Sequence, residues 1–167
     1  MKIFLWLVGV LVGLATLLFV PGLFLSPARS LTREILINAP RVKVWQVITS
    51  YASQTQWRKS LSRVEILDAT NGQERWREYP HRGPAISFAV VSSRAPALLD
   101  SRFWGGAHGT WQGELIETES GTLLYFTEHI EIRNPSLRPI AAVLFDLEKF
   151  MDTYATDLKA QVERNDT

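Results

Sequence analysis

The sequence contains no cysteine, which excludes a disulfide framework, a thiolate metal site and a cysteine nucleophile. It also has almost no excess charge, because the formal net charge is +1. Lys2 is the one charged residue among the first 28, so residues 29–167 carry 17 basic and 17 acidic side chains. A neutral domain lacks the positive field that non-specific nucleic-acid binding requires. We therefore expect no nucleic-acid partner.

The motifs of the common catalytic and cofactor sites are missing as well. His81, His108 and His129 have no HExxH spacing, and no serine lies in a GxSxG elbow. No glycine pattern matches a P-loop or a dinucleotide site. We expect neither a metal nor a cofactor. His108, in the glycine-rich stretch 105–109, is a candidate general base, and a solvated loop histidine is the alternative interpretation.

The N-terminus carries a long uncharged run. Ile3 to Leu25 would span about 34 Å as a helix, at ~1.5 Å per residue, and a bilayer core is ~30 Å thick. Residues 1–28 are therefore predicted to be a transmembrane anchor with a short linker, and residues 29–167 the folded domain. A signal peptide cleaved after Ala28 is the alternative, although the run is longer than the usual 7–15 apolar residues.

This anchor predicts a single-pass protein of a bacterial-type inner membrane or a plasma membrane. The side of the membrane stays open, because Lys2 before the run and the basic residues after it favour opposite orientations. Gly9 and Gly13 form a GxxxG spacing that would allow a homodimer, and coincidence is the alternative explanation.

The remaining chain reads as one strand, two short helices and a run of hairpins. Val44, Val47, Ile48 and Tyr51 have the spacing of an amphipathic helix. Asn71-Gly72 is a strong two-residue turn signal. The expected strands are 32–38, 64–69, 73–79, 85–93, 98–104, 110–118 and 122–133.

A long C-terminal helix is the clearest element. Its apolar stripe recurs at three- and four-residue steps through Ile140, Val143, Leu144, Leu147, Met151, Tyr154, Leu158 and Val162. The stripe predicts one continuous helix of about six turns. Because only the preceding strands can cover it, we expect an α+β fold in which an antiparallel sheet grips this helix.

The order of these elements resembles the SRPBCC superfamily, which includes START-like lipid-transfer domains and polyketide cyclases. The matching residues are Ile37-Asn38-Ala39-Pro40 with Val44-Trp45, Trp57-Arg58, Trp76-Arg77-Glu78, Phe103-Trp104-Gly105-Gly106, Gly109-Thr110-Trp111, Thr127-Glu128, Asn134-Pro135 and the final helix. The resemblance implies a helix-grip fold with a deep apolar cavity between sheet and helix. Ala107-His108 departs from the pattern and suggests a reshaped loop at the mouth.

Glu128 is the most informative polar residue. By the two-residue period of a strand, it shares a face with Leu124, Phe126 and Ile130. A carboxylate on an apolar face must raise its pKa or acquire a partner. Glu128 is therefore a candidate for hydrogen bonding to a ligand or for acid–base catalysis. An ion pair with an arginine such as Arg102 or Arg138 is the alternative.

The residues expected to bind a ligand are large side chains of the predicted sheet and helix. They are Trp76, Trp104, Trp111, Phe126, Glu128, Leu147 and Met151. Aromatic side chains suit a cavity wall and an ordinary core equally well, so a purely structural role is the alternative.

Three functions are compatible with these sequence features. The first is membrane-tethered binding of a lipid or other hydrophobic small molecule, as a carrier, sensor or transfer module. The second is a cyclase- or dehydratase-type enzyme acting through Glu128 and His108. The third is a protein-interaction module with a vestigial cavity, which predicts a filled interior and an exposed apolar patch.

Overall fold

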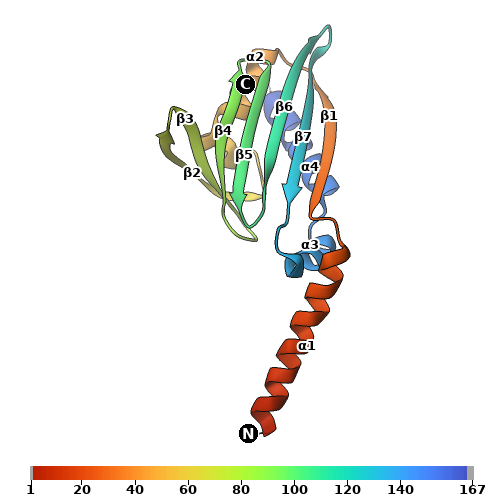
Figure 1. The fold of residues 1–167 in the computed structure, drawn as a ribbon. Helices are drawn as coiled ribbons and strands as arrows, with labels where there is room; N and C mark the ends of the chain where they lie inside the picture. Colours follow the sequence, from red (N-terminus) through yellow and green to blue (C-terminus); the bar gives the residue numbers. More distant parts are fainter. Residues whose placement is uncertain (1, 165–167) are drawn as a thin grey trace.

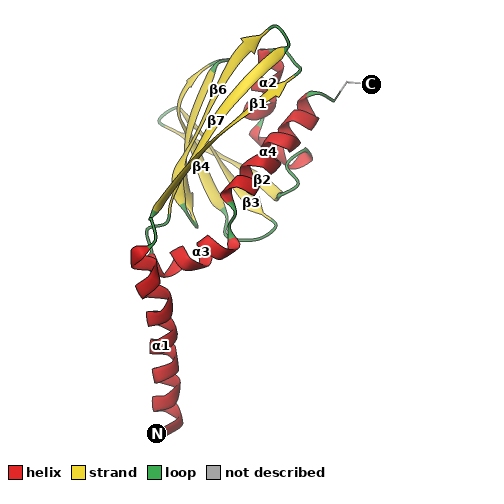
Figure 2. Ribbon diagram, turned by 90° about the vertical axis from the view of Figure 1, so that its right-hand side faces the viewer, coloured by secondary structure: helices red, strands yellow, loops and turns green. Residues whose placement is uncertain are grey.

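A computed structural model describes residues 2–164 of the chain. A curved antiparallel sheet of seven strands forms one layer, and the helix α4 crosses its concave face (Figures 1 and 2). The α+β helix-grip fold is therefore confirmed. The elements in chain order are α1 Lys2–Phe24, β1 Ala28–Ile37, α2 Arg41–Thr49, η1 Tyr51–Gln56, β2 Leu61–Thr70, β3 Gln73–Pro80, β4 Ile86–Arg94, β5 Leu98–Gly105, β6 His108–Thr118, β7 Gly121–Glu131, η2 Pro135–Leu137, α3 Arg138–Leu144 and α4 Leu147–Val162.

The strands β2 to β7 follow one another as a meander, and β1 pairs with β7 to give the order β1-β7-β6-β5-β4-β3-β2. Asn71 and Gly72 have φ angles of 54° and 74° between β2 and β3. Both residues tolerate this left-handed conformation, which matches the twist of the flanking strands. All seven expected strands are present, with shifted ends.

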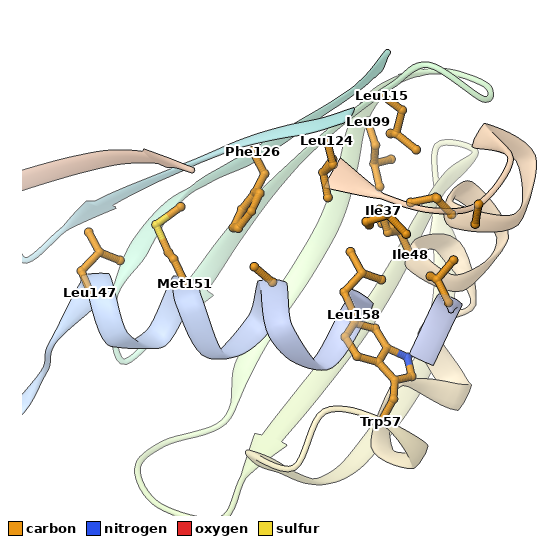
Figure 3. Close-up of a cluster of buried hydrophobic side chains, with 14 residues drawn as sticks. Ile37, Ile48, Trp57, Leu99, Leu115, Leu124, Phe126, Leu147, Met151 and Leu158 are labelled. Carbon is orange, nitrogen blue, oxygen red and sulfur yellow. The ribbon is translucent and has the colours of Figure 1, made fainter. Parts of the chain in front are cut away.

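The core lies between the sheet and α4. The inward face of α4 contributes Leu147, Met151, Ala155, Leu158 and Val162. These side chains belong to one cluster with residues of β1, β6, β7 and α2, and Figure 3 shows Phe126 of β7 facing Met151 of α4. The apolar stripe of the helix, which recurs at three- and four-residue steps, thus packs against strand residues that alternate with a period of two.

The predicted C-terminal helix is wrong in its N-terminal third, because it is broken in two. Phe145 is extended, with φ −118° and ψ 108°, and separates α3 from α4. Asp146 then caps α4 by accepting a hydrogen bond from the Lys149 N–H at 3.0 Å. As a result, Val143 and Leu144 do not continue the buried stripe and are 84% and 79% exposed.

The helix α1 projects away from the sheet at the end where α3 lies (Figure 2). Within the described residues, no helix is both long and apolar enough to cross a membrane. The predicted transmembrane segment is therefore not supported, nor are the single-pass membrane localisation and the homodimer through Gly9 and Gly13. The last turn of α1 instead packs on the domain: Gly22 lies against Pro135, and the Arg138 Nη1 donates to the Gly22 carbonyl at 3.0 Å.

Candidate functional site

A cavity of about 160 Å³ lies between the sheet and α4. Its lining is mostly apolar and comes from α2, η1, the strands β2 to β7, α4 and the segments before β2 and α4. The lining residues are Ile48, Tyr51, Gln54, Arg58, Ser60, Leu61, Trp76, Glu78, Pro80, Ile86, Phe88, Leu99, Ser101, Phe103, Trp111, Phe126, Glu128, Ile130, Phe145, Phe150, Met151 and Tyr154.

Strand alternation places most of these side chains. Trp76 and Glu78 are two apart on β3, and Phe126 and Glu128 are two apart on β7, so each pair projects from the same face of the sheet. The sheet curves around α4, which lets strands at distant positions in the sheet line one space.

Aromatic rings form several groups around the cavity, and two of them include residues of the sheet. In the first group, Tyr51 stacks on Trp76 with a centroid distance of 3.7 Å, and Trp76 stacks on Phe88 at 5.0 Å. In the second group, the Phe126 ring lies 6.4 Å from Trp111 and 5.5 Å from Tyr154. Such ring pairs are geometrically specific, so they fix the shape of the cavity.

A buried ion pair adjoins these rings. Arg58 Nη1 donates to Glu78 Oε1 at 2.7 Å and to Gln54 Oε1 at 2.6 Å. Glu78 Oε1 also accepts from Trp76 Nε1 at 3.0 Å. Burial acts to lower the pKa of Arg58, but the charge of Glu78 and its hydrogen bond outweigh burial, so the pKa is raised. Arg58 therefore stays charged.

Glu128 faces the same cavity without a hydrogen bond to any described residue, although it is only 8% exposed. Burial raises its pKa to about 8, although the positive charge of Arg58 acts to lower it and Glu78 adds to the rise. Near neutral pH the carboxyl is thus mainly protonated, and its O–H is a donor that a ligand can occupy.

Tyr154 is the second hydroxyl-bearing group of this kind. Its side chain lines the cavity from α4, and Arg58 lies over its ring, 5.4 Å from the centroid. Burial raises the pKa of the Tyr154 hydroxyl, against the positive charge of Arg58, which acts to lower it. The hydroxyl therefore stays protonated. The lining also contains the hydroxyls of Tyr51, Ser60 and Ser101, so the cavity offers several neutral O–H groups among mostly apolar side chains.

Five of the residues expected from the sequence line the cavity, namely Trp76, Trp111, Phe126, Glu128 and Met151. Trp104 does not, because Ser101 and Phe103 occupy the inward positions of β5, and Trp104 instead lies near Arg75 and Arg102. Leu147 packs in the core at the start of α4.

The structure also places His108 away from the cavity lining. It is the first residue of β6 and pairs with Glu131 of β7. The glycine-rich segment 105–109, expected from the sequence to contain a reshaped loop, is a tight hairpin connection between β5 and β6. Nothing in this position supports His108 as a general base.

The alternative ion pair of Glu128 with Arg102 or Arg138 is wrong. The guanidinium of Arg102 lies 5.9 Å from the Trp104 ring. Arg138 donates only to backbone carbonyls, including those of Ile132 and Gly22. The arginine that acts on Glu128 is Arg58, through its charge rather than through a salt bridge.

Sequence reasoning missed Arg58, Glu78 and Tyr154 as parts of the site. Glu78 had a usable signal, because it lies two residues from Trp76 on one strand. Tyr154 belonged to the predicted apolar stripe. Arg58 had no such signal, because it lies in the irregular segment between η1 and β2.

For metals, the described residues include no group of three or more potential ligands placed to hold an ion.

Solved structures with the same architecture support the fold. The aromatase/cyclase Zhui from Streptomyces sp. R1128 is 14% identical, with a TM-score of 0.68 over 82% of this chain and 94% of that one. A START superfamily protein from Mycobacterium smegmatis is 14% identical, with a TM-score of 0.64 over 80% and 97% of the two chains. A protein from Thermus thermophilus, also 14% identical, has a TM-score of 0.69 over 83% of this chain and all of that one.

No curated protein matches this chain at a significant level. A family model does: the one described as polyketide cyclase / dehydrase and lipid transport matches residues 28–163. This range runs from the start of β1 to the end of α4 and includes every residue of the cavity lining. The chain therefore belongs to the polyketide cyclase/dehydrase and lipid transport family.

Proposed function

We propose that this protein is a carrier or sensor that binds a hydrophobic small molecule in the cavity, with the protonated carboxyl of Glu128 donating a hydrogen bond to it. The observation that carries the proposal is a buried carboxyl that lines an apolar cavity and has no hydrogen-bond partner among residues 2–164. A buried polar group without a partner costs free energy, and a ligand acceptor would recover that cost.

The chemistry of the lining supports a ligand with a hydrogen-bond acceptor at one end. Glu78 and Gln54 are both engaged by Arg58, so they offer little to a ligand. The carboxyl of Glu128 and the hydroxyls of Tyr51, Ser60, Ser101 and Tyr154 remain, and all of them are neutral O–H donors near pH 7. A carbonyl or ether oxygen on an apolar body matches this combination, whereas a carboxylate ligand would meet the negative charge of Glu78. The proposal does not depend on a membrane anchor.

A cyclase- or dehydratase-type enzyme is the second candidate, favoured by one observation. A general acid or base works best with a pKa near the working pH, and burial brings the pKa of Glu128 to about 8. Relatives include a protein described as an aromatase/cyclase. The candidate reaction is proton transfer to or from a bound carbonyl compound, with Glu128 as the exchanging group and Arg58 as fixed positive charge.

The third hypothesis, a protein-interaction module with a vestigial cavity, receives less support. It required a filled interior, and the interior contains a cavity with a polar group directed to it.

Native mass spectrometry of the full-length protein, isolated from the cells that express it, is the first test. A stoichiometric adduct of a hydrophobic compound is the expected result, and the adduct should be lost in Glu128→Leu. Glu131→Leu is the matched control, because Glu131 lies three residues along the same strand and outside the cavity lining. A protein that stays bare and binds no hydrophobic probe would overturn the proposal.

Turnover separates the two candidates. Once a ligand is identified, Glu128→Gln keeps an N–H donor but cannot exchange a proton. A carrier should therefore bind the ligand with nearly unchanged affinity in this variant and leave it chemically intact. An enzyme should convert the ligand in the wild type and lose at least about a hundredfold in rate in the variant, the usual contribution of general acid–base catalysis.

A further inference from the structure

A second hollow adjoins the cavity on the outer side of α4. This groove has a volume of about 290 Å³ and shares Arg58, Ser60, Phe145, Phe150 and Tyr154 with the cavity lining. Its other lining residues are Leu144, Asp146, Lys149, Thr153 and Asp157. Five side chains thus line both spaces, so the groove lies directly beside the cavity.

Phe145 and Phe150 stand at this junction. Their ring centroids are 5.7 Å apart, and the rings are tilted by 49°. Phe145 is the residue at which the C-terminal helix breaks, so its side chain is set by an extended backbone and not by a helical turn. A shift of either ring would open a passage between the cavity and the groove.

The size of the cavity decides what it can hold. A cavity of roughly 150 Å³ binds a benzene-sized molecule. The cavity of about 160 Å³ therefore accommodates a single ring with a small substituent, and any longer ligand must leave it. A hollow of about 20 Å³ also touches Ile130 and Phe145 but holds no more than a water. A hollow of about 550 Å³ shares only Phe145 with the cavity lining, whereas the groove shares five residues with it. The groove therefore has the more extensive contact with the cavity.

Both spaces have mainly apolar surfaces, but they differ in one carboxyl group. Glu128 lines the cavity but not the groove. The groove has an apolar floor of Leu144, Phe145, Phe150 and the Tyr154 ring, while Lys149 and Asp157 lie on its α4 side. Leu144, which lines the groove, is 79% exposed. Its apolar surface is therefore available to a ligand.

We infer that the ligand is an amphiphile bound head-first: a small cyclic head with an oxygen acceptor lies against Glu128, and an apolar chain leaves between Phe145 and Phe150 into the groove beside Leu144. This inference rests on the proposed function and specifies the class of ligand and its direction. It also explains why the exposed apolar side chain of Leu144 lies next to the cavity mouth.

A homologous series of phenyl ketones tests both the head and the chain. Acetophenone, butyrophenone, hexanophenone and octanophenone share one ring and one carbonyl and differ in chain length. Affinity, measured by NMR titration near pH 7, should rise about fourfold per added methylene while the groove fills, the factor expected for burying one CH₂ group.

Two neighbouring residues of α3 supply the variant and its control. Leu144 lines the groove, whereas Val143 is similarly exposed and does not. Leu144→Glu should weaken octanophenone binding about tenfold, the cost of losing one apolar contact of this size, and leave acetophenone binding unchanged. Val143→Glu should change neither. Since both positions are on the surface, both variants are expected to fold.

The possible outcomes distinguish a failure of this inference from a failure of the proposed function. If acetophenone binds but the longer ketones bind no better, or if Leu144→Glu and Val143→Glu have equal effects, the chain does not follow this groove and the inference falls while the proposed function stands. If no ketone of the series binds and no hydrophobic adduct is found, both fall.

Discussion

Glu78 and Glu128 face the same cavity from β3 and β7, but only Glu78 is ion-paired with Arg58. The two carboxyl groups thus differ in their surroundings: Glu78 accepts a hydrogen bond from the Arg58 guanidinium at 2.7 Å, whereas burial raises the pKa of Glu128 to about 8. Arg58 is ion-paired with Glu78 and not with Glu128. Glu128 is therefore free to donate a hydrogen bond to a ligand.

This difference predicts how stability depends on pH. Between about pH 4.5 and 8 the Glu128 carboxyl keeps its proton in the folded protein, next to Arg58, Glu78 and Tyr154, and loses it in the unfolded chain. The unfolded state therefore binds fewer protons, and the contribution of Glu128 to stability falls by up to ~1.4 kcal/mol per pH unit as pH rises through this window.

Urea unfolding of wild type and Glu128→Gln at several pH values measures the effect. The difference in unfolding free energy between them should shift with pH, in the direction of a relatively more stable variant at pH 8. Glu131→Gln, on the same strand but outside the cavity lining, should follow the wild-type profile. Parallel profiles for wild type and Glu128→Gln would show that Glu128 is already ionised in the folded state.

The ion pair itself predicts a large effect of removing one partner. Arg58→Met should lower the free energy of unfolding by about 3–5 kcal/mol, because the Glu78 carboxylate would remain buried without a counter-charge. The double variant Arg58→Met/Glu78→Leu should recover part of this loss. Arg133→Met, which removes an exposed pair with Glu131, should cost less than about 1 kcal/mol. An Arg58→Met variant as stable as the Arg133→Met control would contradict the expected burial of the pair.

The break in the C-terminal helix predicts a cap effect. Asp146→Ala should destabilise the protein by about 1 kcal/mol, because the first turn of α4 loses its side-chain acceptor. Asp146→Ser keeps an acceptor oxygen and should restore most of the loss. Thermal unfolding monitored by circular dichroism would distinguish the two, and equal losses for Ala and Ser would mean that the carboxylate acts by charge alone.

Gly109 predicts a steric effect near the cavity wall. A Cβ at this position would collide with the His129 carbonyl oxygen of β7 and with the ring of Phe103, which lines the cavity. Gly109→Ala should therefore destabilise the fold by about 1–3 kcal/mol. Gly9→Ala is the control, because nothing lies within 4 Å of a Cβ there. Unchanged stability in Gly109→Ala would require β6 and β7 to move apart at no cost.

The sequence alone predicted the strands of the sheet and one polar residue of the site, Glu128. Strand alternation assigned Glu128 to the apolar face, and the turn residues Asn71 and Gly72 located the first hairpin. Arg58 was beyond such reasoning, since it lies outside any periodic element and reaches Glu78 only through the tertiary fold. The charge partner of Glu128 could not be assigned without that contact.

The helix break was missed for a different reason. The apolar stripe of α4 continues in phase through Leu144 and Val143, so periodicity alone gives one long helix. A single Asp146 in the middle of that stripe is the capping signal, but an aspartate on the polar face of a continuous helix looks the same in sequence. The second difference between prediction and structure concerns α1. The uncharged run Ile3 to Leu25 predicted a membrane span, but no helix among the described residues is both long and apolar enough to cross a membrane.

The pairing of β1 with β7 has a consequence for folding kinetics. Ala28 lies opposite Glu131, so β1 leaves the ribosome well before its partner strand has been synthesised. Closing so long a loop costs entropy before any hydrogen bond of that ladder forms, and chains dominated by such distant contacts fold slowly. The hairpins β2 to β7 can assemble locally, and docking of β1 then becomes a late step that completes the sheet only after β7 is in place.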